Sequence, residues 1–318
     1  MNRAWLAVAA CFVTAAAWAQ TWPAKPVRII VPFAPGGGVD TVSRFLAQKL
    51  TEQVGGTFLV ENRAGAGGVL GAEIAAKAAP DGHTLFISAP EFSINPSVRS
   101  KLPYDPFRDF AYISQLTSGQ FMLASHPSVP VRTVRQLIAL AKTRPGQLNY
   151  GSSGAGGINH LAGELLQFMT GIRWVHVPFK GAGPATTALM GGEVDFVFAS
   201  TTGLVAPAKS GKVRPIAVTG SKRFAELPDT PTIAESGVAG YSVTGWYGFY
   251  APAGTSAAIV KRLNDEARRG LFNADIKDKL EKTGNEAVVS SPDEFVAFMR
   301  AEIDKWAKVV KAAQIRVE

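Results

Sequence analysis

Cysteine is nearly absent from this sequence of 318 residues, which contains a single one, Cys11, near its start. A disulfide-rich fold is therefore excluded. Runs of one charge are also missing, because the 33 Lys and Arg residues occur singly or in pairs although the net charge is +8. This pattern does not support a nucleic-acid-binding stripe, whereas affinity for a small anion is compatible with it.

Long hydrophobic runs are lacking after the first twenty residues. The charge-free stretch at residues 236–260 is long enough to cross a bilayer, but glycine and proline interrupt it six times. Such a stretch is typical of a strand with turns, so no membrane-spanning helix is expected there.

The first residues have the pattern of an export signal. Arg3 is followed by an apolar segment at residues 4–17, and Ala17-Trp18-Ala19 has the small residues that signal peptidase requires. Cleavage after Ala19 would leave a mature protein that begins at Gln20. Cleavage at Cys11, as in a lipoprotein, is disfavoured because it would leave an apolar stub. We therefore expect residues 1–19 to be a signal peptide and the mature protein to be periplasmic.

The rest of the chain alternates short apolar strands with glycine loops and helices. A β-branched run at residues 27–32 precedes a glycine turn and then apolar residues at helical spacing, and the order recurs at residues 58–79. A second series of the same kind occupies residues 121–218. This alternation predicts an α/β fold with a mostly parallel sheet and helices on both faces.

The last part of the sequence predicts two helices. Residues 255–271 have apolar residues at helical spacing, and Ser291-Pro292-Asp293-Glu294 is a capping box. We expect these helices to return to the first α/β unit. Domain one would then be discontinuous, with residues 20–123 and 249–318, and domain two would be residues 124–248.

Four loops place glycine and small residues where a strand ends and a helix begins. They lie at residues 35–38, 65–68, 152–157 and 181–184. A helix N-terminus offers free N–H groups and partial positive charge, and glycine allows an anion to approach the main chain. Two such loops in each unit indicate an anion site between the domains.

Known enzyme motifs are either incomplete or absent in this sequence. The glycines at residues 36–38 and 65–71 do not fit the dinucleotide fingerprint, no phosphate-binding GxxxxGK[ST] sequence occurs, and residues 151–155 lack the last glycine of a nucleophile elbow. The histidines are isolated, so no metal site is expected; they are His83, His126, His160 and His176. We expect no cofactor.

Eight segments together resemble the Bug family, the TctC-like substrate-binding proteins of tripartite tricarboxylate transport. They are residues 30–40 (IVPFAPGGGVD), 60–68 (VENRAGAGG), 80–85 (PDGHTL), 151–154 (GSSG) with His160-Leu161, 177–181 (VPFKG), 192–195 (GEVD), 228–232 (PDTPT) and 251–255 (APAGT). The resemblance covers nearly the whole mature chain in order. It implies a type II periplasmic-binding-protein fold with two lobes joined by crossover strands.

The resemblance also implies a function and a site. The protein would bind a small carboxylate in the interdomain cleft, act as a monomer without catalysis, and serve membrane subunits of a tripartite tricarboxylate transporter or a sensor. The implied ligand contacts are Phe33, Ala34, Pro35, Gly36, Gly37, Gly38, Ala66, Gly67 and Gly68 in domain one, and Ser152, Ser153, Gly154, Ala155, Gly156, His160, Lys180, Gly181 and Asp195 in domain two.

Three positions depart from the family pattern. Ala64 replaces a usual proline and His83 a usual tyrosine, which affects local rigidity. Gly157 stands where many members have serine, so a hydroxyl near the ligand is missing. The identity of the carboxylate therefore does not follow from the resemblance.

Several of these residues also have a purely structural interpretation. Asp40 fits a cap on its helix better than a ligand contact, because its charge would repel an anion. His160 and Asp195 suit hydrogen bonds to neighbouring loops as well as to ligand, and Lys180 suits a solvated rim charge. The aromatic residues Trp246, Tyr247 and Phe249 fit core or hinge packing.

The sequence also leaves open a second class of function, that of an enzyme. Ser152 or Ser153 with His160 could form the nucleophile and base of a secreted hydrolase. No acid that would orient the histidine is evident in the sequence.

Overall fold

A computed structural model of the chain describes residues 22–179, 181–282 and 284–315. The expected signal peptide at residues 1–19 lies outside the described residues, and so does Lys180. Among the helices of the described ranges, none is both long enough and apolar enough to cross a membrane.

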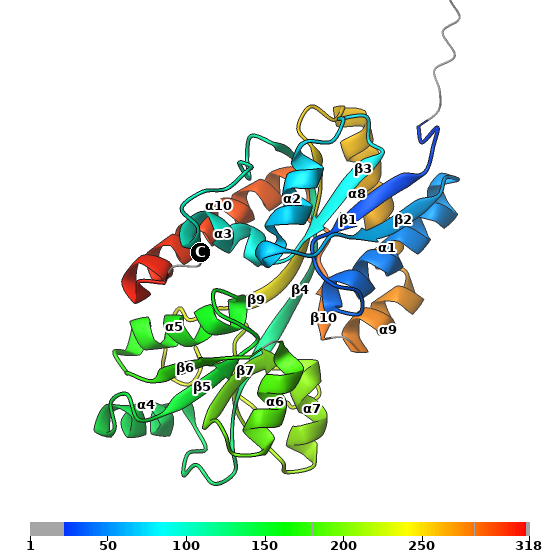
Figure 1. Cartoon of the computed structure of the whole chain (residues 1–318). Coiled ribbons are helices and arrows are strands. Elements are labelled where there is room, and N and C mark those ends of the chain that lie inside the picture. Colours follow the sequence, from blue (N-terminus) through cyan, green and yellow to red (C-terminus); the bar gives the residue numbers. More distant parts are fainter. Residues whose placement is uncertain (1–21, 180, 283, 316–318) are drawn as a thin grey trace, which may run out of the picture.

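One curved sheet of ten strands runs through the described part of the chain (Figure 1). Eight strands follow the order β2-β1-β3-β9-β4-β7-β5-β6, and β8 and β10 each pair with β4. The strands are β1 (Val27–Val31), β2 (Phe58–Asn62), β3 (Thr84–Ser88), β4 (Phe110–Ser125), β5 (Asn149–Ser152), β6 (Val175–Pro178), β7 (Phe196–Ser200), β8 (Arg214–Val218), β9 (Thr244–Pro252) and β10 (Asn285–Ala287).

The sheet is mixed, whereas the sequence predicts a mostly parallel one. Strand β1 pairs in parallel with β2 and β3, and β5 pairs in parallel with β6 and β7. The long strands β4 and β9 are antiparallel to each other and to their other neighbours. Because β4 leads from the first half of the molecule to the second and β9 leads back, these two strands must run in opposite directions.

Helices cover both faces of the sheet in each half, as Figure 1 shows. They are α1 (Gly38–Val54), α2 (Val69–Ala76), α3 (Glu91–Val98), α4 (Val134–Thr143), α5 (Ile158–Thr170), α6 (Ala182–Met190), α7 (Thr201–Lys209), α8 (Ala257–Leu271), α9 (Ala274–Lys282) and α10 (Pro292–Ala313). Successive side chains of a strand point to opposite faces, which separates the core into layers. In β1, Ile29 packs with α1 and α8, whereas Ile30 packs with α2, α3 and α10.

The second half repeats this arrangement. Leu161 and Leu165 of α5 pack with α4 and with Tyr150 and Phe198 of the sheet. Helices α6 and α7 cover the other face, over Val197 and its neighbours. Because helices cover both faces of the sheet, the loops gather at the edge formed by the carboxyl ends of the parallel strands.

The C-terminal helix α10 joins the two halves. Its capping box is confirmed, since the Ser291 hydroxyl accepts the Glu294 N–H and the Glu294 carboxylate accepts the Ser291 N–H. Phe295 packs in the first half, but Trp306 packs in the core of the second. The sequence predicts that this helix belongs to domain one; in the structure the helix is long enough to contact both halves.

Candidate functional site

Helix α1 begins at the first glycine loop of the sequence. Gly37 is its N-cap, with an extended backbone at φ −77°, and it brings no side chain to cap the helix. Gly36 before it has φ +88°, a left-handed conformation that glycine adopts readily. Residues 34–38 are exposed. The first N–H groups of α1 therefore face an accessible surface.

Asp40 holds this loop in place. Its buried carboxylate accepts hydrogen bonds from the Gly36 N–H at 2.9 Å, from Asn62 Nδ2 at 2.9 Å and from Arg44 Nε at 3.0 Å. Burial alone would raise the pKa of Asp40, but these hydrogen bonds and the Arg44 charge outweigh it and lower the pKa. This geometry agrees with the structural interpretation of Asp40.

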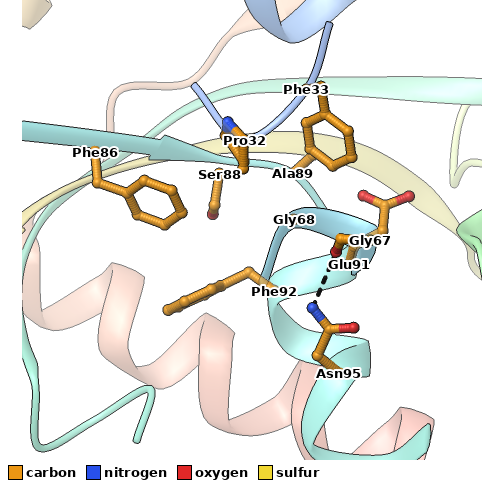
Figure 2. Close-up of a pocket in the computed structure, with 10 residues that line it drawn as sticks. All are labelled: Pro32, Phe33, Gly67, Gly68, Phe86, Ser88, Ala89, Glu91, Phe92 and Asn95. Atoms are coloured by element: carbon orange, nitrogen blue, oxygen red, sulfur yellow. Dashed lines mark hydrogen bonds between the residues drawn. The ribbon is translucent and has the colours of Figure 1, made fainter. Parts of the chain in front are cut away.

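A hollow in the first half brings three of the predicted residues together (Figure 2). Phe33 from the first loop faces Gly67 and Gly68 from the second. Ala66 lies beside them in the short 3-10 turn Ala66–Gly68. The remaining lining residues are Pro32, Phe86, Ser88, Ala89, Glu91, Phe92 and Asn95.

The matching loop of the second half precedes helix α5. Gly157 is the N-cap, again extended at φ −79° and without a capping side chain of its own. Gly154 and Gly156 have φ +144° and +74°, which favour glycine. Ser152 is completely buried, and its hydroxyl accepts the Gly154 N–H at 3.1 Å. The loop is thus fixed from within while its helix offers main-chain donors.

The two histidines next to this loop form a stacked pair. The rings of His160 and His176 lie 3.7 Å apart between centroids. Burial is the main cause that lowers the pKa of His160 to about 3 and that of His176 to about 4. Nδ1 of His160 accepts the Gly156 N–H at 3.0 Å, so the neutral ring carries its proton on Nε2, near Glu164. His160 therefore supports the loop, which is the structural alternative for this residue.

The serine and histidine suggested for a hydrolase do not pair as expected. Ser152 Oγ lies 2.6 Å from Nε2 of His176, not of His160. Ser153 Oγ instead accepts a hydrogen bond from Asn159. Because Ser152 has no exposed surface, its hydroxyl is not accessible to a substrate in this structure.

The last two predicted positions differ in their placement. Gly181 is the N-cap of α6, and its N–H donates to the Ser153 carbonyl at 3.1 Å, so it adjoins the loop before α5. Asp195 lies at the opposite end of β5 from Ser152. There its carboxylate accepts the Asn149 N–H at 2.9 Å, and the Asn149 side chain accepts the Asp195 N–H. Asp195 therefore connects the starts of two strands, which agrees with the structural interpretation of this residue.

Glu91 is a candidate that the sequence analysis missed. It is the first residue of α3 in the first half, yet its Oε1 lies beside Gly157, the N-cap of α5 in the second half, where a Cβ atom would be 4.0 Å away. Burial raises the pKa of this carboxyl even though two backbone N–H groups act in the opposite direction. Its position after the end of strand β3, at the edge where ligands bind in α/β sheets, is the signal that could have identified it.

Tyr247 of β9 completes this region. A Cβ atom at Gly38 would lie 2.3 Å from its hydroxyl oxygen, so only glycine fits beside it. Burial, followed by the nearby Glu91 charge, raises the pKa of Tyr247. Trp246 and Phe249 are fully buried, as expected for core residues. The starts of α1 and α5 thus converge on a region that contains Tyr247 and Glu91.

Comparison with known proteins gives consistent matches. The model of the tripartite tricarboxylate transporter family receptor matches residues 42–315. BugT of Bordetella pertussis is 33% identical over 306 residues, which are 96% of this chain and 94% of BugT. Two solved structures from R. palustris are also similar: Rpa4515 with adipate (36% identity, TM-score 0.82, 93% and 99% of the two chains) and MatC with bound malate (32%, 0.78, 91% and 100%).

The fold and the paired helix N-termini define a two-lobed solute-binding protein. The chain belongs to the tripartite tricarboxylate transporter family of receptors, and the resemblance to Bug proteins is confirmed.

Proposed function

We propose that this protein is a periplasmic receptor that captures a small organic carboxylate between its two halves and delivers it to a membrane transporter or a sensor. The observation that carries the proposal is that α1 and α5, one from each half, both begin at a glycine N-cap. Main-chain N–H groups at such ends bind carboxylates, and glycine gives the ligand access to them.

The relatives support the carboxylate as ligand. The solved structures that resemble this chain include one with adipate and one with malate, both of which are dicarboxylates. We propose a small organic carboxylate as the ligand of this protein too, held mainly by backbone amides of residues 33–38, 66–68 and 152–157. Gly181 adjoins the last of these loops, and we propose Lys180 as a charge at its rim.

The division into two domains is part of this proposal. The expected boundaries after residues 123 and 248 fall inside the two long strands β4 and β9. If β4 and β9 bend and the contacts of α10 with the second half shift, residues 124–248 can close on the rest of the molecule. We further propose that the mature protein begins at Gln20 and acts as a monomer; mass spectrometry of the exported protein tests the first point, and a lipid on Cys11 would contradict it.

A thermal-shift screen of organic acids, followed by calorimetry, tests the function. A ligand at a hundredfold excess over its dissociation constant should stabilise the protein by about 2.7 kcal/mol. Stabilisation by one or more small carboxylates supports the receptor. If no carboxylate shifts the unfolding temperature or gives heat of binding, the proposed function is wrong.

One geometric observation favours the hydrolase alternative, namely the contact between Ser152 and His176. Against it stands the burial of Ser152. A serine-reactive fluorophosphonate separates the two functions. Stoichiometric labelling of Ser152 or Ser153 would establish a nucleophile and contradict a receptor without catalysis, whereas the receptor should remain unlabelled.

A further inference from the structure

The carboxylate of Glu91 lies at a helix end where the proposed function needs main-chain donors. Glu91 is the first residue of α3, and its own N–H and that of Ile158, the first residue of α5, are near enough to act against the effect of burial on the pKa of its carboxyl. A Cβ atom at Gly157 would lie 4.0 Å from Glu91 Oε1, which places that oxygen beside the N-cap of α5. A protein carboxylate therefore occupies part of this helix terminus.

Glu91 also belongs to the hollow formed by the predicted ligand loops. Figure 2 shows its carboxylate turned away from the ring of Phe92 and on the side of Phe33. Tyr247, beside Gly38 at the start of α1, is close enough for the Glu91 charge to raise its pKa. Glu91 is thus positioned between the two helix ends that would bind ligand.

This placement has consequences for a ligand with two carboxylates. One carboxylate can use the donors at the start of α1, but a second one directed at α5 would meet the carboxylate of Glu91 beside the N-cap of that helix. Like charges at close range in a partly buried site repel strongly. A hydrogen-bond donor in the same place would instead be attracted to the Glu91 carboxylate.

We propose that Glu91 is a specificity-determining residue that selects ligands with one carboxylate and, at the other end, an ammonium or hydroxyl group that donates to Glu91. This inference rests on the proposed function and narrows its ligand class to amino or hydroxy acids. The Glu91 carboxylate then acts as a fixed acceptor beside the start of α5.

Calorimetry with matched ligands tests this selection. The probes are pairs in which an ammonium or hydroxyl group replaces one carboxylate on the same chain: succinate with 3-aminopropanoate, and adipate with 5-aminopentanoate or 5-hydroxypentanoate. All titrations are made at pH 8. For the chain length that binds, wild type should bind the amino or hydroxy acid at least tenfold more tightly than the dicarboxylate.

The decisive variant is Glu91→Gln, which keeps the size of the side chain but removes the charge. Its preference should move at least tenfold toward the dicarboxylate. Glu52→Gln is the matched control, because Glu52 is exposed and lies 14 residues further along α1 than Gly38, about 21 Å along the helix. Glu91→Ala is the second variant if the glutamine protein does not fold.

The outcomes separate the two proposals. A wild type that prefers dicarboxylates, or a Glu91 variant with the wild-type preference, overturns the role of Glu91 while leaving the receptor in place. Failure of wild type and both variants to bind any carboxylate overturns the proposed function, and the role of Glu91 with it.

Discussion

The Glu91 carboxylate of the first half lies beside Gly157 of the second half, where a Cβ atom would be 4.0 Å from Glu91 Oε1. Glu91 begins α3 and Gly157 is the N-cap of α5, and these helices are separated in sequence by the whole of β4, α4 and β5. A protein side chain therefore already lies at this helix end, where the proposed function needs main-chain donors.

The histidine pair gives a prediction for the pH dependence of stability. In the folded protein the pKa values of His160 and His176 lie at about 3 and 4, whereas the unfolded chain has the ordinary value of 6.5. Below pH 6.5 the unfolded chain therefore binds more protons than the folded one at these sites. Each histidine should reduce the free energy of unfolding by up to about 1.4 kcal/mol per pH unit between pH 6.5 and 4.5.

Urea unfolding of wild type and His176→Gln between pH 7.5 and 4.5 measures this effect. The difference between the two proteins is informative, because the raised pKa values of Glu91 and Glu164 act in the opposite direction and cancel in the comparison. Wild type should lose more stability on acidification than the variant, and a control His126→Gln should behave as wild type. Parallel curves for wild type and His176→Gln would refute the prediction.

Asp40 offers a test of how the first loop is held. Asp40→Ala leaves the donors of Gly36 and Asn62 without their acceptor, which should lower the free energy of unfolding by about 1–3 kcal/mol. Asp265→Ala removes an exposed carboxylate paired with Lys261 and should cost about 0–1 kcal/mol. Denaturant unfolding of both variants is the measurement. Equal losses would mean that Asp40 does not brace the loop.

The contact between Gly38 and Tyr247 predicts a compensating pair of substitutions. Gly38→Ala places a Cβ atom 2.3 Å from the Tyr247 hydroxyl and should destabilise the protein by about 1–3 kcal/mol. Adding Tyr247→Phe removes that oxygen and leaves the nearest ring atom at 3.4 Å, so most of the loss should be recovered.

Unfolding of both single variants and the double variant gives the coupling energy between the two sites. Gly183→Ala is the control, because a Cβ atom there meets nothing within 4 Å. Losses that simply add in the double variant would show that the close contact is not the cause.

The sequence predicts the parts of this protein that depend on local rules. The glycine loops before α1 and α5 and the capping box of α10 follow from residues within a few positions of one another. Family resemblance supplies the fold class. The mixed direction of the sheet was missed because β4 and β9 connect the halves, and pairing between strands more than a hundred residues apart leaves no local pattern.

The site is less predictable because its contacts cross between elements. Glu91 follows a strand without a glycine loop, and Gly157, which lies beside its carboxylate, is 66 residues away. Ser152 meets His176 rather than His160, since β5 and β6 are neighbours in the sheet. Trp306 reaches the second half because α10 is a single long helix, and its indole shares the Glu302 carboxylate with Trp246.

The central claim, that main-chain donors at the starts of α1 and α5 bind the carboxylate, is tested most directly by calorimetric titration of three variants with the best acid from the screen. Gly37→Pro and Gly157→Pro each remove one N–H at positions whose φ of −77° and −79° proline tolerates. Lys180→Ala removes the charge that we propose for the rim. A hydrogen bond to a charged group contributes about 1.5–3 kcal/mol, whereas an exposed ion pair gives about 0–1 kcal/mol.

We expect each proline variant, folded as judged by circular dichroism, to bind the acid at least tenfold more weakly than wild type. The affinity of Lys180→Ala should stay within about fivefold of the wild-type value. Loss of binding in Lys180→Ala with normal affinity in both proline variants would contradict the central claim.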